Sequence, residues 1–359
     1  MSLNRQIIFW VATLAVLVIF LLVFRAILLP FVGGMALAYL LDPVADWFQR
    51  RGLNRLAATL IILVMSVIVF VAVLVLIVPV LVNQFVLLIA NMPAYIDQLE
   101  VLIQSLLQSG WAERLGVNPE EVRNSVGTFL TQGTTWISTF VGSVWSGGLA
   151  FVNVIALLVV APVVAFYLLY DWDRMIGLID SWLPRDHAPT IRKLAGEIDR
   201  VISGFVRGQA LVSLTLGIFY ATSLVILGVN FGFLIGLVAG LVSFIPYLGS
   251  VLGFIVSVGI ALLQFWPDWI FPVAAAGIFI VGQLLEGYVL QPFFIGTNVG
   301  LHPVWLMFAL FAFGLLFGFV GLLVAIPAAA AVGVLVRYAL AQYLASPIYK
   351  GQSAKSDDS

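Results

Sequence analysis

A stretch of 129 residues between Arg207 and Arg337 carries only two formal charges, and this scarcity of charge restricts how the chain can fold. The two are Asp268, which stands between two tryptophans, and Glu286, which stands in an otherwise apolar run. Over the whole chain 9% of residues are charged and 63% are hydrophobic, whereas soluble proteins average about 25% charged residues. Such a chain buries its apolar surface in lipid, so the sequence predicts an all-α polytopic membrane protein.

Eight apolar segments approach or exceed the roughly 20 residues that a helix needs to cross a bilayer. Glycines and prolines interrupt several of them, so we expect some of the eight to be broken or re-entrant. The segments are residues 7–24, 26–41, 56–82, 148–170, 209–228, 231–263, 270–291 and 304–336.

We expect residues 1–346 to form a single transmembrane domain. Within it, residues 83–146 form an extracytoplasmic helical segment and residues 171–208 a cytoplasmic helical segment. Residues 347–359 are short of apolar side chains and are predicted to be a disordered cytoplasmic tail.

The distribution of lysine and arginine sets the orientation. With the N-terminus inside, the segments 42–55, 171–208 and 337–359 hold three, six and three basic residues, and Arg5 adds one more. Thirteen of the 16 basic residues are then cytoplasmic. Because basic residues favour the cytoplasmic side, we predict that both termini lie inside.

Glu286 is the residue that points most directly to function. A carboxylate at membrane depth costs several kcal/mol unless it meets a partner, water or a transported ion. Gln283 lies three residues earlier, on the same face of a helix. Such a pair can hold a proton or a monovalent cation. The alternative is a structural acid that reaches interfacial water or an ion-pair partner.

Three prolines lie where long apolar runs could break. The first follows Phe244-Ile245 and precedes Tyr247 and Gly249, the second is Pro292 after Gln291, and the third is Pro327. Proline removes a backbone donor and displaces a carbonyl, and transporters place solute sites at such breaks. Because 33 residues of helix would extend about 50 Å, we predict that 231–263 or 270–303 is broken. An ordinary kinked helix is the alternative at each proline.

Motifs for enzymatic chemistry are scarce. The chain has no cysteine, no glycine-rich phosphate loop with a lysine, and only two histidines, His187 and His302. We therefore expect no catalytic residue, metal site or cofactor, and the near-neutral charge balance gives no sign of nucleic acid binding. Asp171 and Asp173 flank Trp172 and could hold a metal in a lipid-modifying enzyme, although such a pair more often ends a helix in water.

Two water-exposed segments have amphipathic patterns. Asn118-Pro119-Glu120-Glu121 has the composition of a helix start. An apolar stripe runs from Ile191 to Phe205, and we expect it to pack on the spans, lie on the membrane or join subunits. A weak internal similarity relates Gly240–Pro246 to Gly321–Pro327 and could mark a structural repeat.

A series of short motifs, in order along the chain, resembles the autoinducer-2 exporter family of bacterial membrane proteins, the PerM-like permeases. The similarity covers nearly the whole chain and is densest after residue 166, and Ser250 departs from it because relatives often carry proline there. The motifs are Phe166–Asp171, Trp182–Pro184, Ile198–Arg200, Gly204–Gln209, Phe244–Gly249, Gln283–Glu286, Leu290–Pro292, Gly300–Pro303 and Phe317–Pro327.

The resemblance implies a secondary transporter that exports a small polar molecule such as autoinducer-2 or exchanges Na⁺ or Li⁺ for protons. It also implies a homo-oligomer. Alternatives are a non-transporting scaffold or partner subunit that docks through helices 92–109 and 189–205, and a lipid-modifying membrane enzyme. We expect the solute or ion pathway to contain Glu286, Gln283, Pro246, Tyr247, Gly249, Gln291, Pro292 and Asn298.

Overall fold

The structure is a computed structural model that describes residues 3–108, 127, 128, 132, 135, 148–295 and 302–350. Within these residues it is built of helices and contains no strand. Among them, six helices are long and apolar enough to cross a membrane: Leu28–Arg50, Arg55–Leu99, Ala188–Leu227, Leu248–Phe265, Ile270–Ile295 and Pro303–Ala345. The predicted all-α polytopic membrane fold is therefore confirmed.

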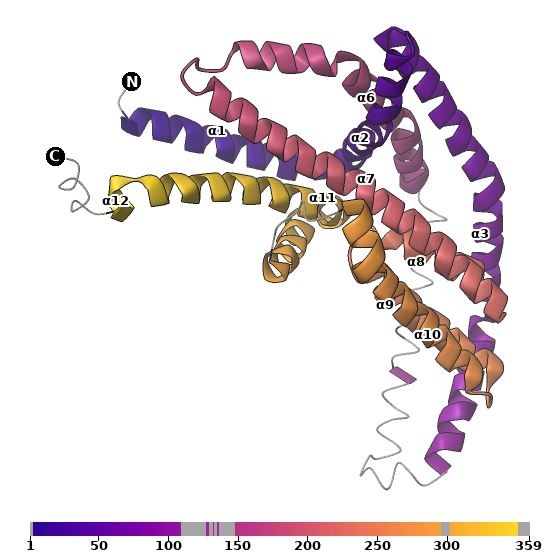
Figure 1. Cartoon of the computed structure of the whole chain (residues 1–359). Coiled ribbons are helices and arrows are strands. Elements are labelled where there is room, and N and C mark those ends of the chain that lie inside the picture. The colour runs from indigo at the N-terminus through magenta and orange to yellow at the C-terminus, as the bar shows by residue number, and fades with distance from the viewer. Residues whose placement is uncertain are drawn as a thin grey trace. The chain divides into compact units, whose positions relative to one another are not determined.

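The helices are labelled in Figure 1 and follow one another along the chain. The predicted helix start at Asn118 and the candidate pathway residue Asn298 lie outside the described residues. The elements are α1 (Leu3–Val23), η1 (Arg25–Ile27), α2 (Leu28–Arg50), α3 (Arg55–Gln108), α6 (Gly148–Ser181), α7 (Ala188–Leu227), α8 (Gly232–Val242), α9 (Leu248–Phe265), α10 (Ile270–Leu285), the π-helix η2 (Glu286–Ile295), α11 (Pro303–Ala345) and α12 (Pro347–Lys350).

Several helices run past the boundaries that hydropathy predicts. Helix α3 has 54 residues and continues the predicted span 56–82 directly into the segment that follows it. Helix α7 has 40 residues and joins the predicted amphipathic stripe to the span 209–228. Because these helices are longer than a bilayer needs, each combines a membrane span with a further helical arm.

The chain forms two compact units, and the helices α3, α6 and α7 contribute to both. Unit 1 takes the described residues of Met1–Ser66, Leu157–Val212 and Gly287–Ser359. Unit 2 takes those of Val67–Ala156 and Ser213–Glu286.

In unit 2, helix α8 lies directly against the second half of α7. Gly232, Gly236 and Gly240 recur every four residues, so they lie on one face of α8. A side chain at Gly240 would collide with the backbone of Gly217, and one at Gly236 with the backbone of Ala221. This spacing of small residues lets two membrane helices approach until their backbones touch.

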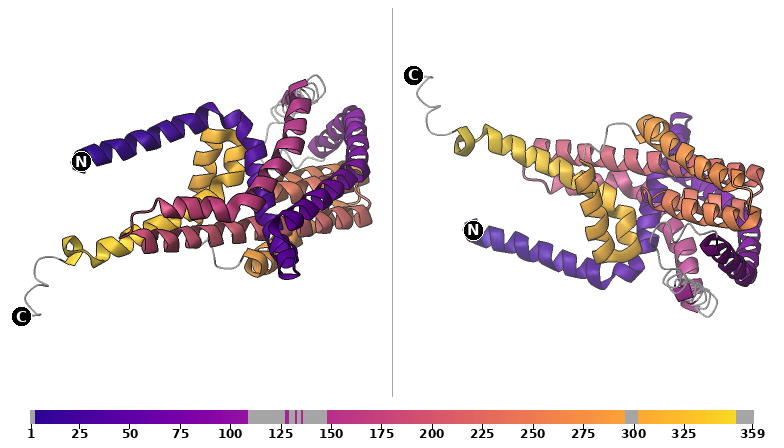
Figure 2. Two further views of the ribbon diagram at one scale, coloured as in Figure 1. Left: turned by 90° about the horizontal axis from the view of Figure 1, so that it is seen from above. Right: turned by 90° about the horizontal axis from the view of Figure 1, so that it is seen from below.

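Helices α8 and α9 form a hairpin, as predicted for the run 231–263. Helix α8 ends at Val242, the chain turns through Pro246, and Tyr247 adopts a left-handed conformation with φ of 67° before α9 begins. Gly249 then packs on the carbonyl oxygen of Ala239. Because α8 has 11 residues, it extends about 16 Å, roughly half of the hydrocarbon core. The run is therefore two packed helices, with α10 beside α9 (Figure 2).

In unit 1, helix α2 packs closely on α6. Gly34 on α2 faces the carbonyl oxygen of Ala161 and the side chain of Val164, and a side chain at position 34 would meet both. The two helices and the start of α3 also bury a small core of Ala38, Ala45, Ile62, Ala165 and Leu169. Small residues again allow the close approach.

The amphipathic stripe on α7 packs on α11. Val201 is buried against Ala330 and Val334, and Leu194 and Ile198 pack around them. Of the roles considered for this stripe, the structure shows packing on another helix.

Helix α11 is sharply kinked, but not at the proline that the sequence predicted. Gly318 has φ of 61° and ψ of −137°, a conformation that residues with a Cβ avoid. The two arms fold back on each other there, so that Gly321 lies on the carbonyl oxygen of Phe313 (Figure 2). Pro327 is buried inside the second arm, so the predicted break at Ile326-Pro327 is wrong.

The structure of this region also tests whether the weak internal similarity marks a structural repeat. Gly240–Pro246 runs from the end of α8 into the turn before α9. Gly321–Pro327 is helical throughout and lies after the kink at Gly318. The two similar sequences therefore have different local structures. The residue with positive φ directly follows the first motif, at Tyr247, and precedes the second, at Gly318.

Candidate functional site

Glu286 is buried at the junction between α10 and η2. The residue is 4% exposed, and Oε2 of its carboxylate accepts a hydrogen bond of 2.8 Å from Nε2 of Gln283. The described residues of unit 2 include no lysine or arginine. Within unit 2 a neutral amide thus donates a hydrogen bond to this carboxylate.

The backbone changes from α to π geometry at Glu286. The π-helix runs to Ile295 and includes both Gln291 and Pro292, so the chain remains helical where the sequence predicted an interruption. Its wider turns leave room for a proline that has no N–H to donate. Gln291 is half-buried and Pro292 is exposed. Both belong to unit 1, whereas Gln283 and Glu286 belong to unit 2.

Tyr220 on α7 packs against the same end of α10. Its ring stacks on Phe279 with ring centres 4.4 Å apart. It also lies so close to Gly282 that a side chain there would collide with the ring and the hydroxyl oxygen. The hydroxyl is buried and has no hydrogen-bond partner in the structure. It faces the side chain of Gln283, and the charge of Glu286 lies within electrostatic reach.

Of the predicted pathway residues, Pro246 and Tyr247 lie in the turn between α8 and α9, and Gly249 lies in the first turn of α9. Tyr247 is exposed, Pro246 is half-buried and Gly249 is buried against α8. Their environment thus differs from that of Glu286, which lies in the packed interior. The structure joins Gln283 to Glu286 by a hydrogen bond and places the other three at the α8–α9 turn and the start of α9.

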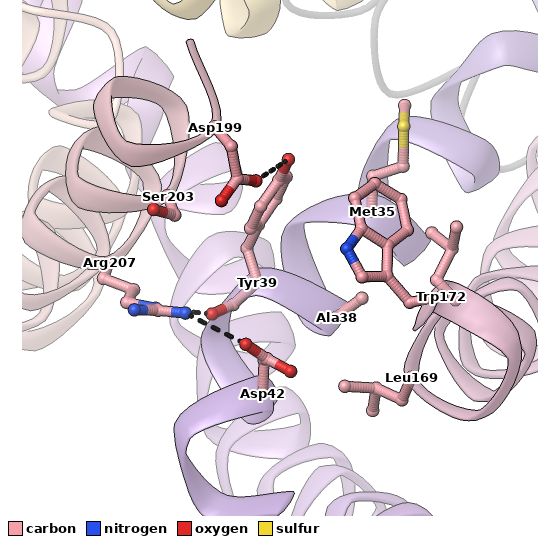
Figure 3. Close-up of a pocket in the computed structure, with 10 residues that line it drawn as sticks. Met35, Ala38, Tyr39, Asp42, Leu169, Trp172, Asp199, Ser203 and Arg207 are labelled. Atoms are coloured by element: carbon pink, nitrogen blue, oxygen red, sulfur yellow. Dashed lines mark hydrogen bonds and ion pairs between the residues drawn. The ribbon is translucent and has the colours of Figure 1, made fainter. Parts of the chain in front are cut away.

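Unit 1 contains a second polar cluster, shown in Figure 3, which lines a cavity of about 110 Å³. Arg207 on α7 donates from Nε to the carbonyl oxygen of Tyr39, at 2.7 Å, and lies 3.5 Å from the carboxylate of Asp42. The hydroxyl of Tyr39 donates to Asp199 at 3.1 Å. Ser203 and Trp172 complete the polar and aromatic part of the lining.

Arg55, at the start of α3, extends this cluster. It donates to the carboxylates of Asp42 and Asp46 and to the carbonyl oxygen of Leu169, at 3.3, 3.1 and 2.7 Å. A further bond of 3.0 Å reaches Gln49. One guanidinium thus connects α2, α3 and α6, using the several donors that arginine provides.

Sequence reasoning missed this cluster. Its members are far apart along the chain, and Asp42, the acid that Arg207 contacts, is 165 residues away. Two spacings were available as signals: Asp199, Ser203 and Arg207 recur every four residues on α7, and Tyr39 and Asp42 are three apart on α2. Each spacing places polar groups on one helix face. Neither spacing indicates that the two faces meet.

The structure places the acidic pair Asp171 and Asp173 inside helix α6. Helix α6 continues past both residues to Ser181, so the expectation that the pair ends a helix is wrong. Among the described residues, no group of three or more histidine, cysteine, aspartate or glutamate side chains is placed to hold a metal ion.

Comparisons with known proteins bear on the whole chain. The model of the family described as "AI-2E family transporter" matches residues 7–341. The chain is 28% identical over 326 residues to the "Putative transport protein YrrI" of Bacillus subtilis, covering 89% of each protein. It is 28% identical over 311 residues to the "Putative permease PerM" of Escherichia coli K12, covering 85% of each. These matches extend through both units and agree with the resemblance found in the motifs.

Proposed function

We propose, from the premise that this chain belongs to the AI-2E family of transporters, that it is a secondary transporter in which Glu286 is the coupling group. The observation that carries the proposal is the burial of this acid where α10 becomes a π-helix. Single π turns inside α-helices occur frequently at functional sites. A buried intramembrane acid is costly and is retained chiefly where a proton, an ion or a solute uses it.

The chemistry of Glu286 suits coupling to a cation gradient. Its ionised form accepts a hydrogen bond from Gln283 and attracts a positive charge. Its protonated form is neutral and donates a hydrogen bond, so it is cheaper to bury in an apolar environment. A group that alternates between these forms can couple movement of a solute to movement of a proton.

The remaining pathway residues are proposed from the backbone around them. Pro246 and Tyr247 form the turn of the α8–α9 hairpin, Gly249 lies at the start of α9, and Gln291 and Pro292 lie in the π-helix that begins at Glu286. Broken or widened helices expose backbone carbonyls that coordinate polar solutes and ions. We include Asn298 from its sequence position.

The family resemblance suggests two substrates: a small polar molecule such as autoinducer-2, exported from the cell, or Na⁺ or Li⁺ exchanged for protons. It also suggests a homo-oligomer in the bacterial inner membrane. We place both termini in the cytoplasm from the basic-residue distribution. Reporter fusions after Asn91 and after Arg185 test this orientation: they are expected on opposite sides of the membrane, and finding both on one side would contradict it.

Flux measurements in everted membrane vesicles test the function. Vesicles containing the chain are expected to move Na⁺, Li⁺ or a small polar solute when a proton gradient is imposed, and to stop when a protonophore collapses the gradient. Vesicles from the same host without the chain are the control. Absence of flux for every solute and cation tested would favour the non-transporting scaffold, and conversion of a labelled lipid would favour the membrane enzyme.

A further inference from the structure

Tyr220 carries a hydroxyl that the packing of unit 2 does not need. The residue is fully buried, and its ring stacks on Phe279 in a contact that a phenylalanine would make equally well. Its hydroxyl oxygen has no hydrogen-bond partner in the structure. Burying such a group alone costs about 1–3 kcal/mol. The buried hydroxyl therefore points to a second state of the protein in which it forms a hydrogen bond.

The position of the hydroxyl identifies its partner. The ring lies flat on Gly282, where only a glycine leaves space for it, and the hydroxyl faces the next side chain, Gln283. That side chain turns its Nε2 toward Glu286. A small rotation of the hydroxyl or the amide would bring Tyr220 within hydrogen-bonding reach of either amide atom, the oxygen Oε1 as acceptor or the nitrogen Nε2 as donor.

We propose that Tyr220, Gln283 and Glu286 form one proton site, in which protonation of Glu286 reverses the amide of Gln283. With Glu286 ionised, Nε2 of Gln283 donates to the carboxylate and Tyr220 donates to Oε1. With Glu286 protonated, the carboxyl O–H donates to Oε1 and Nε2 donates to the oxygen of Tyr220. Only one proton is added. The hydroxyl serves both states because it is both donor and acceptor. This inference deepens the proposed function and rests on it for the role in transport.

A proton fits this site better than a metal ion. In the structure the group turned toward the carboxylate is an amide nitrogen, which is a hydrogen-bond donor and not a metal ligand, and only the reversed amide would offer an oxygen. Tyr220 is the titratable group that α7 places beside Glu286. Other titratable side chains described in unit 2 lie elsewhere: Asp97, Tyr247 and Asp268 are exposed, and the Tyr95 hydroxyl accepts from Asn230.

The ionised state depends more on Tyr220 than the protonated state does. In the ionised state the chain of hydrogen bonds ends on a full negative charge, and charge-assisted bonds are roughly twice as strong as neutral ones. Removal of the hydroxyl therefore weakens the ionised state more. The site should then hold its proton about three- to fivefold more tightly.

Infrared difference spectroscopy on the full chain in liposomes, titrated with pH, tests this directly. The protonated-carboxyl band that disappears in Glu286→Gln reports Glu286. In Tyr220→Phe, which keeps the ring, the midpoint of this band is expected about half a pH unit higher than in the parent. Gly282→Ala, which displaces the ring, is expected to raise the midpoint of this band as well. Tyr95→Phe removes a hydroxyl far from the site and should leave it unchanged.

The outcomes separate the two proposals. A Tyr220→Phe midpoint equal to that of the parent, in protein that elutes as one sharp species, would show that Tyr220 is structural and would overturn the proton site. So would a parent with no carboxyl band assignable to Glu286. A parent that shows the band and the shift but moves no solute would leave the proton site standing and refute the transport function alone.

Discussion

In unit 2, helices α7, α8 and α9 approach one another through glycines, whereas in unit 1 arginine side chains add polar links between helices to the close contact that Gly34 makes between α2 and α6. Gly236 and Gly240 bring backbone onto backbone. Arg55 and Arg207 instead extend side chains across larger separations to carboxylates and carbonyl oxygens. The first kind of contact tolerates no added atom, and the second can be broken and re-formed without moving a backbone. A packed unit thus holds the buried acid, and a polar unit holds the cavity of Figure 3.

The largest effect on this comparison is expected from Gly236→Ala. The added Cβ would meet the backbone of Ala221 and Tyr220, which has no rotamer with which to yield, so α8 must move away from α7. We expect loss of more than about 3 kcal/mol of stability, seen as aggregation or a much lower unfolding temperature in detergent. Gly277→Ala on α10 is the control, because open space surrounds that glycine, and it should be neutral or slightly stabilising. Equal behaviour of the two variants would contradict close backbone packing.

Arg55→Ala tests how much the arginine side chains stabilise unit 1. The side chain is 18% exposed, and its loss removes one donor each from Asp42, Asp46 and the carbonyl oxygen of Leu169, although Asp42 keeps its contact with Arg207. We expect a loss of about 1–3 kcal/mol, less than for a fully buried ion pair because solvent screens part of the cluster. Thermal unfolding of the detergent-solubilised chain measures it. The matched control is Arg50→Ala, because Arg50 is an exposed arginine at the end of α2. An equal loss of stability in both variants would contradict a stabilising role of the Arg55 hydrogen bonds.

The smallest effect concerns an exposed pair in unit 1. Arg192 bonds both oxygens of Asp180, at 2.6 and 2.8 Å, and this hydrogen bonding holds the pKa of Asp180 below its usual value. The resulting stability is present above the unfolded pKa, about 3.9, and is lost as the pH falls through the lower folded value. The unfolding temperature of the parent should therefore exceed that of Asp180→Asn slightly near neutral pH, with the difference vanishing in acid. A difference that grows in acid would contradict this sign.

These two kinds of contact were not equally predictable from the sequence. The scarcity of charge predicted a helical membrane protein, and the break between α8 and α9 followed from a run too long and too rich in glycine and proline to be one helix. The Gln283–Glu286 pair followed from helical spacing. These inferences succeed because they depend on neighbours within one helix.

The missed features depend on contacts between helices. The cluster of Arg207, Tyr39 and Asp199 joins residues that are 160 or more positions apart, and helical spacing does not indicate which faces meet. For α11 the sequence offered Pro327 as a candidate break, because proline breaks helices. A buried proline is tolerated there, while Gly318 supplies the backbone conformation that reverses the chain.

The central claim is that the buried acid of the packed unit couples transport to a cation. Flux driven by a proton gradient, measured in proteoliposomes from about pH 5 to about pH 9, tests it most directly in Glu286→Gln. This change keeps size and hydrogen bonding but removes the titrating charge, and a neutral amide costs less to bury than a carboxylate, so the protein should fold. We predict that flux falls at least tenfold or loses its pH dependence, while Asp268→Asn, which alters an exposed acid, transports like the parent. A Glu286→Gln variant with the parent's flux at every pH would show that the acid is structural and would contradict the account.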